Sequence, residues 1–97
     1  MGYGDDWMNM SDAGLREKVL KYISKTDKVL RNLKVEGSPS SISANLIIEV
    51  VDEAKRYFED AKYYLERKEY DVSLASIAYC EGLLDALRIM KLIEFEW

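Results

Sequence analysis

Hydrophobic side chains recur every three or four residues in three separate segments of this chain. The first stripe consists of Leu15, Val19, Tyr22, Thr26, Val29 and Leu33. The second consists of Ala44, Ile47, Val51, Ala54, Phe58, Ala61 and Leu65, and the third of Ile77, Cys80, Leu84 and Leu87. Because this spacing places side chains on one face of an α-helix, the pattern predicts three amphipathic helices.

Capping residues and helix breakers predict where these helices begin and end. Ser11 is a good N-cap for the first helix, and either Pro39 or Ser43 can start the second. The linker at residues 67–71 contains neither glycine nor proline, so one continuous helix is an alternative there. The bulky apolar residues change phase across this linker, however, and Asp71 can cap a new helix, which favours a helical hairpin. The predicted helices span residues of about 12–34, 42–67 and 71–91.

Three amphipathic helices joined by short loops are expected to pack as one antiparallel bundle. We therefore predict an all-α, up-and-down three-helix bundle that forms a single domain over residues 11–97. Residues 1–10 are predicted to be a flexible tail. The C-terminal sequence KLIEFEW either extends the third helix or folds back over the bundle as an apolar strap.

Composition narrows the chemistry that the chain can perform. The 97 residues include one cysteine, Cys80, and no histidine, while 48% are hydrophobic and 33% are charged. An intramolecular disulfide, a zinc site of the Cys/His type and histidine-based catalysis are therefore excluded. No stretch approaches the roughly 18 apolar residues of a membrane span, and the N-terminus lacks the pattern of a secretory signal. We predict a cytoplasmic, non-enzymatic protein with no catalytic residue, metal site or cofactor.

Glu81 and Asp85 lie one helical turn apart in the third helix and are the best candidates for an acid pair. At about 100° per residue they share a narrow polar stripe with Arg88, and Asp85 can pair with Arg88 three residues away. The pattern favours the solvent-facing edge of the helix over a catalytic dyad. A carboxylate-bridged metal site would need more inward-pointing acids, and the histidine of the di-iron Glu-x-x-His pattern is missing.

The apolar arcs of the second and third helices are wider than a three-helix core requires. On a helical wheel each arc spans about 200°, against about 120° for the first helix. The excess predicts a protein interface made of Leu46, Val50, Tyr57, Tyr64, Tyr79, Leu83 and Met90. Small residues at positions 75, 78, 82 and 86 either receive another helix of the same bundle or line this interface. A homodimer is the preferred interpretation, and another protein is the alternative partner.

The first helix carries most of the positive charge of an acidic chain. Residues 15–34 hold seven basic and two acidic side chains, whereas the whole chain has a net charge of −4. A stripe about 80° wide is a candidate anion-binding site and consists of Lys18, Lys21, Lys25 and Lys28. Nucleotide or nucleic-acid binding is therefore an alternative function. No aromatic residue is interleaved with the lysines, and Walker A, GxGxxG and zinc-finger motifs are missing, which favours a solvated face that complements acidic helices.

Two motifs in the second half of the chain carry a family resemblance. An Asp-Ala-x-Tyr-x-Leu-Glu segment begins at Asp60, and a Ser-x-Ala-Tyr-x-x-Gly-x-Leu-Asp-Ala run begins at Ser76, with Tyr70 at the turn between them. With these motifs the chain resembles an archaeal family of short helical proteins, domain-of-unknown-function family 357. The resemblance implies a three-helix bundle and an archaeal source, but no activity. The chain departs from the family pattern at Glu81, where relatives carry a histidine before the glycine.

A looser similarity links residues 64–87 to the helical hairpins of tetratricopeptide repeats and HEPN domains. No 34-residue repeat follows the hairpin, so a solenoid is not expected. HEPN nucleases use an Arg-x4–6-His motif, which a chain without histidine cannot contain. A non-catalytic HEPN-like partner of a nucleotidyltransferase is therefore a further alternative function.

Overall fold

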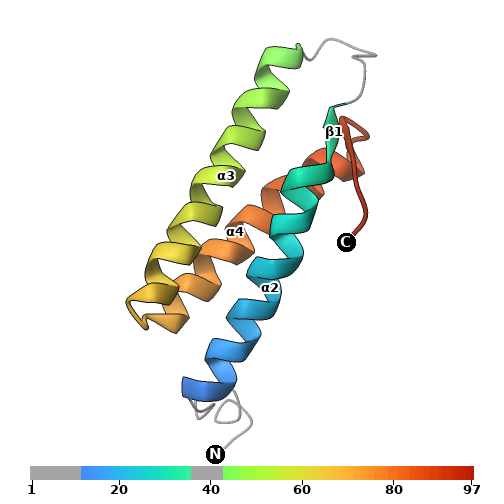
Figure 1. Ribbon diagram of the computed structural model, residues 1–97. Coiled ribbons are helices and arrows are strands. Elements are labelled where there is room, and N and C mark those ends of the chain that lie inside the picture. The colour runs from blue at the N-terminus through green and yellow to red at the C-terminus, as the bar shows by residue number, and fades with distance from the viewer. Residues whose placement is uncertain (1–11, 36–42) are drawn as a thin grey trace, which may run out of the picture.

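The computed structural model describes residues 12–35 and 43–97, which contain three helices and two short strands. The helices are α2 (Asp12–Asn32), α3 (Ala44–Glu66) and α4 (Tyr70–Ile89), and the strands are β1 (Lys34–Val35) and β2 (Ile93–Glu94). α2 runs along the molecule, α3 runs back, and α4 returns beside α3 (Figure 1). This arrangement confirms the predicted all-α, up-and-down three-helix bundle.

The observed helix ends lie within two residues of the predicted ones, but one predicted cap is wrong. Ser43 caps α3, because its hydroxyl accepts a hydrogen bond from the amide of Leu46 at 3.2 Å. Glu69, not Asp71, is the N-cap of α4, and Asp71 lies in the first turn. The Asp71 carboxylate in this position interacts favourably with the positive N-terminal end of the helix dipole. Ser11, Pro39 and the predicted N-terminal tail lie outside the described residues.

α3 and α4 each end at a lysine in the left-handed backbone region, with φ of 63° at Lys68 and 62° at Lys91. At the first turn, the Glu69 amide donates to the Tyr64 carbonyl at 2.9 Å, and the Lys68 amide donates to the Leu65 carbonyl at 3.0 Å. This pair of hydrogen bonds is a Schellman motif, which satisfies the last carbonyls of the helix. It explains how the predicted hairpin turns without glycine or proline.

The three predicted apolar stripes meet in one hydrophobic core. The buried members of these stripes include Val19, Val29, Ile47, Val51, Phe58, Ile77, Cys80, Leu84 and Leu87. Leu15, Tyr22 and Leu65 pack against the edge of this core and are half-buried, whereas Ala44 at the start of α3 is exposed. The helical period of the sequence therefore identified the inward faces correctly, and it overestimated burial near the helix ends and at Tyr22 in the middle of α2.

α3 and α4 form the most extensive helix pair because small side chains lie between them. Ala54 and Ala61 on α3 and Ser73 on α4 have no exposed surface. The Ser73 hydroxyl donates a hydrogen bond of 2.6 Å to the carbonyl oxygen of Ala61. This hydrogen bond satisfies the Ser73 hydroxyl, which is buried between the two helices. Helix α2 then packs across the pair, as Figure 1 shows.

Residues 92–97 fold back along the bundle, so the strap is the correct one of the two alternatives for the C-terminal sequence. β2 pairs antiparallel with β1, with Ile93 opposite Val35 and Glu94 opposite Lys34. Leu92 and Ile93 are buried, with 4% and 2% of their surface exposed. This C-terminal strap therefore completes the core beside α2. Within the described ranges, no helix combines the length and the apolar character that a membrane crossing requires.

Candidate functional site

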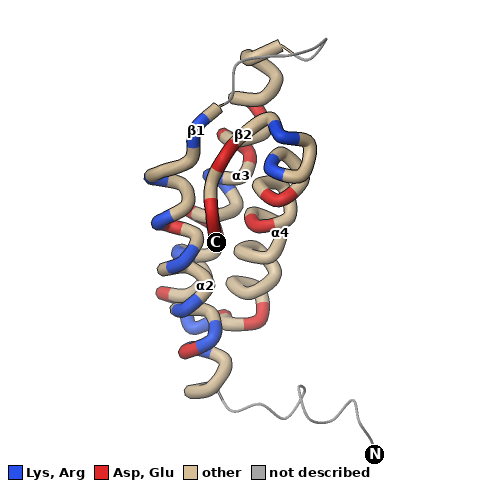
Figure 2. Tube along the Cα trace, turned by 90° about the vertical axis from the view of Figure 1, so that its right-hand side faces the viewer, with Lys and Arg blue, Asp and Glu red and all other residues tan. Residues whose placement is uncertain are grey.

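A groove of about 680 Å³ lies between α2 and the C-terminal strap. We call it the lysine groove, and it is lined by Lys21, Ser24, Lys25, Lys28, Val29, Asn32, Lys34, Glu94, Phe95, Glu96 and Trp97. Figure 2 shows basic residues along α2 and acidic residues on the strap beside it. Three of the four predicted anion-binding lysines thus line one groove, whereas Lys18 lies outside it.

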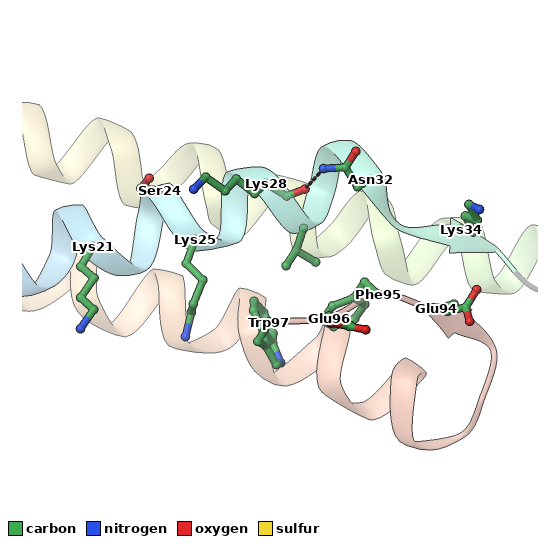
Figure 3. Close-up of a pocket in the computed structure, with 11 residues that line it drawn as sticks. Lys21, Ser24, Lys25, Lys28, Asn32, Lys34, Glu94, Phe95, Glu96 and Trp97 are labelled. Carbon is green, nitrogen blue, oxygen red and sulfur yellow. Dashed lines mark hydrogen bonds between the residues drawn. The ribbon is translucent and has the colours of Figure 1, made fainter.

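The strap brings aromatic rings to the lysines, so the expectation of a stripe without aromatic neighbours is wrong in three dimensions. The Lys25 ammonium nitrogen lies 5.0 Å from the centroid of the Trp97 ring and 4.9 Å from that of Tyr22. Phe95 and Trp97 meet edge to face, with centroids 4.9 Å apart. Figure 3 shows both strap rings beside the lysines of α2. Lys34, Phe95 and Trp97 are among the eight groove residues that sequence reasoning did not assign to this site.

Glu81 faces α2 rather than open solvent. Its Oε2 atom accepts a hydrogen bond from the Thr26 hydroxyl at 3.1 Å and lies 3.8 Å from the Lys25 ammonium nitrogen. Thr26 is fully buried, so this bond satisfies a hydroxyl inside the helix interface. The predicted solvent-facing edge is therefore wrong at this position, because a helical wheel of α4 does not show that α2 packs against the stripe.

Asp85 joins α4 to the strap. Its Oδ1 atom accepts a hydrogen bond of 2.7 Å from the indole nitrogen of Trp97 and one of 3.1 Å from the Arg88 guanidinium, which is the predicted pair. Both carboxylates thus have partners that hold the fold together. In the part of the chain that the structure describes, no three acidic or cysteine side chains gather as a metal site would require.

The predicted protein interface forms one strip along α3 and α4. Tyr57 and Tyr79 stack with ring centroids 5.2 Å apart, which fixes the register of the two antiparallel helices. Steps of seven or eleven residues from Tyr57 reach the other α3 members, and steps of four and eleven residues from Tyr79 reach Leu83 and Met90, so all of them share a helix face with one of the two stacked rings. Leu46, Tyr79 and Met90 are exposed, whereas Val50, Tyr57, Tyr64 and Leu83 are half-buried. We call this strip, together with Ala75, Ala78, Gly82 and Ala86, the α3–α4 face.

A shallow hollow of about 480 Å³ lies on the α3–α4 face and is lined by Ala75, Ala78, Tyr79, Gly82 and Leu83. A Cβ atom added to Gly82 would meet no heavy atom within 4 Å. The side chains at 75, 78 and 86 are exposed as well. These small residues therefore receive no helix of the described bundle, and that alternative for them is wrong. They line an open apolar surface instead.

Cys80 lies in the core beneath this face and has no exposed surface. Burial raises the pKa of its thiol to about 12, and the neighbouring Glu81 carboxylate adds to the effect. Since the thiolate is the reactive form of cysteine, the side chain is an inert part of the core at neutral pH. It is therefore not a candidate nucleophile.

We expect iodoacetamide to leave Cys80 unmodified in the native protein near pH 8 and to alkylate it after denaturation. Because the folded pKa of about 12 exceeds the ordinary value of about 8.5, burial of the thiol stabilises the fold below about pH 8.5. This contribution is lost as the pH rises toward 12. Mass spectrometry measures the labelling, with Lys55→Cys, on an exposed part of α3 outside the α3–α4 face, as the control thiol. Rapid labelling of native Cys80 would contradict its burial.

Comparison with known proteins gives one family assignment. The sequence profile of a family described as proteins of unknown function, DUF357, matches residues 21–93. No curated protein and no solved structure matches the chain. The matched residues include all of α3 and α4 and extend from Lys21 in the groove to Ile93 in the strap. Because the match covers about three quarters of the sequence, the chain belongs to the DUF357 family.

Proposed function

We propose that this chain is a cytoplasmic, non-enzymatic protein that works by self-association, with two copies packed through the α3–α4 face. The observation that supports the proposal most is an open apolar hollow with an exposed aromatic ring at its edge. The side chain of Tyr79 is 64% exposed. The α4 residues that line the hollow beside it include Ala75 and Gly82, which are small and uncharged. Contiguous apolar surfaces of this kind are typical of protein interaction sites.

The shape of α4 favours a second copy of the same chain as the occupant. In an interface with two-fold symmetry, the same patch must carry both the protruding and the receiving groups. If two antiparallel α4 helices meet with Tyr79 over Gly82 of the other copy, each large residue lies opposite a small one. The resulting pairs across the interface are Tyr79–Gly82, Leu83–Ala78 and Ala75–Ala86. Small side chains at such crossings allow helix axes to approach to about 8 Å.

The charges at the two ends of α4 fit the same arrangement. Asp71 lies in the first turn of α4, and Lys91 follows its last turn. In the antiparallel register, Asp71 of one copy would lie beside Lys91 of the other. The opposed helix dipoles would also attract each other at both ends. The centre of the contact stays apolar, as is usual in the cores of homodimer interfaces.

Replacing Gly82 with glutamine gives the sharpest test, because it should change stability and association in opposite directions. The new side chain has free space in the single protomer, and the loss of a helical glycine should stabilise that protomer by about 0.5–1 kcal/mol. In the dimer, the same side chain would occupy the place of the Tyr79 ring. We expect the dissociation constant to rise at least tenfold, as measured by sedimentation equilibrium over a range of protein concentrations.

Tyrosine substitutions supply the matched comparison. Tyr79→Glu should weaken association by about 2 kcal/mol, or roughly thirtyfold, because it removes the central aromatic ring. Tyr63 is also on a helix surface and is 53% exposed; it is not a residue of the α3–α4 face, but its ring meets that of Tyr64 edge to face. Tyr63→Glu should therefore weaken the dimer much less than Tyr79→Glu. A wild-type protein that sediments as a monomer at every concentration, or a Gly82→Gln dimer of unchanged affinity, would contradict the proposal.

A further inference from the structure

The lysine groove is lined by α2, β1 and the C-terminal strap and shares no residue with the proposed dimer face. Several of its lysines have no acidic partner in the described part of the chain. Lys21, Lys28 and Lys34 have no carboxylate within 4.0 Å among the residues that the structure describes. Lys25 differs from them, because it lies between the Glu81 carboxylate and the Trp97 ring. Three lysines of the groove are therefore available for an anion, and the fourth holds the aromatic wall in place.

Of the two acidic residues of the groove, Glu94 lies at the end opposite Lys21, whereas Glu96 lies between Phe95 and Trp97 on the strap (Figure 3). Glu94 is opposite Lys34 in the β1–β2 ladder. Figure 3 shows Glu94 near Lys34, whereas Lys21, Lys25 and Trp97 lie toward the opposite end of the groove. Since exposed charges are screened beyond about 8 Å at physiological ionic strength, these local lysines outweigh the net negative charge of the chain. The end that contains Lys21 is thus the positive end.

The aromatic wall of the groove is fixed in position. The Trp97 indole nitrogen donates to Asp85 at 2.7 Å, Lys25 covers part of the ring, and Phe95 supports its edge. Trp97 is nevertheless 37% exposed and lines the groove. An indole ring that is fixed in position but accessible can stack on a nucleotide base. Lysines without acidic partners beside it can bind the phosphates of the same nucleotide.

We propose that the lysine groove binds a nucleotide unit, with the base against the Phe95–Trp97 wall and the phosphates against Lys21 and Lys28. The two lysines are seven residues apart on α2, which corresponds to about 10 Å along the helix axis. The long, flexible side chains of two lysines at that separation can converge on the phosphate chain of a free nucleotide or on consecutive phosphates of single-stranded RNA. The groove volume of about 680 Å³ lies in the usual range for small-ligand sites.

Fluorescence of Trp97 can test this proposal directly. Trp7 is the other tryptophan of the chain, so Trp7→Phe leaves Trp97 as the single reporter. We titrate this protein at low salt with ATP, with a mixed-sequence single-stranded RNA and with tripolyphosphate. ATP or RNA should quench or shift the emission. Tighter binding of RNA would identify the polymer as the ligand, whereas equal or tighter binding of ATP would identify the free nucleotide.

Matched variants separate the groove from general surface charge. Lys21→Gln and Lys28→Gln should each weaken binding severalfold, whereas Lys18→Gln removes the same charge from the same helix outside the groove and should have little effect. Trp97→Leu, followed by calorimetry, should weaken binding roughly tenfold or more, and Trp97→Phe should retain part of the affinity. For RNA, the logarithm of the binding constant should fall with the logarithm of salt concentration with a slope of about −1 to −2.

Three results would overturn the proposal. The first is no binding of ATP or RNA at low salt. The second is tripolyphosphate binding as tight as that of ATP, which would show that the aromatic wall does not take part. The third is an equal loss of affinity in Lys18→Gln and Lys21→Gln. Gly82→Gln should bind these ligands like the wild type, so failure of the groove and failure of the dimer are separate outcomes.

Discussion

Replacing Ile93 with alanine is expected to lower the free energy of unfolding by about 2–5 kcal/mol. The residue lies in a strand of only two residues, yet it is 2% exposed and belongs to the hydrophobic core. Removing three carbon atoms would lose their burial and leave a cavity between the strap and the helices. Urea denaturation followed by circular dichroism measures the change, at a protein concentration that keeps the association state constant.

Glu94→Ala is the matched control for this experiment. Glu94 is the neighbouring residue in the same strand, and its side chain is exposed. Its replacement should change stability by no more than about 0.5 kcal/mol. Ile93→Ala should also release Trp97 toward solvent and shift its fluorescence to the red, because the strap holds the indole against α4. Equal stability of the two variants would show that the strap contributes nothing to the core.

Replacing Ala61 with leucine is expected to destabilise the protein by about 1–3 kcal/mol through overpacking. Ala61 has no exposed surface, and its carbonyl oxygen accepts the 2.6 Å hydrogen bond from Ser73 on α4. A larger side chain would push the two helices apart at this buried contact and would strain the hydrogen bond. Thermal and urea denaturation measure the loss of stability.

Ala78→Leu makes the same chemical change on the exposed side of α4. Alanine and leucine are both good helix formers, so the substitution should leave the stability of the protomer within about 0.5 kcal/mol. Because Ala78 lines the open hollow, the added side chain should instead weaken self-association. If Ala61→Leu were as stable as Ala78→Leu, α3 and α4 would not be packed as closely as the structure shows.

Local sequence signals predicted the helices well because helical periodicity and capping act over a few residues. Ile77, Cys80, Leu84 and Leu87 form the predicted stripe and are all buried. The same reasoning predicted the wide apolar strip of α3 and α4, and all seven of its predicted interface residues are exposed or half-buried. The cap at Asp71 was wrong because the Schellman turn at Lys68 starts α4 one residue earlier.

Long-range contacts limited what could be predicted about the groove. The C-terminal alternation of Ile93, Phe95 and Trp97 with two glutamates has the period of an extended strand, which agrees with the observed strap, but the sequence prediction left a longer third helix as an equal alternative. No local signal could show that the strap pairs with β1, about sixty residues earlier, or that Trp97 reaches Lys25. The groove depends on both contacts.

The sequence by itself determined which residues form helices and which face of each helix is apolar, because both depend on spacing along one segment. Only the tertiary structure decided what covers each face. It placed α2 against Glu81, placed the strap against Asp85, and left the small residues around Gly82 uncovered. The physical reason is that burial depends on contacts between segments distant in the chain, and a periodic pattern contains no information about which segment will be the neighbour.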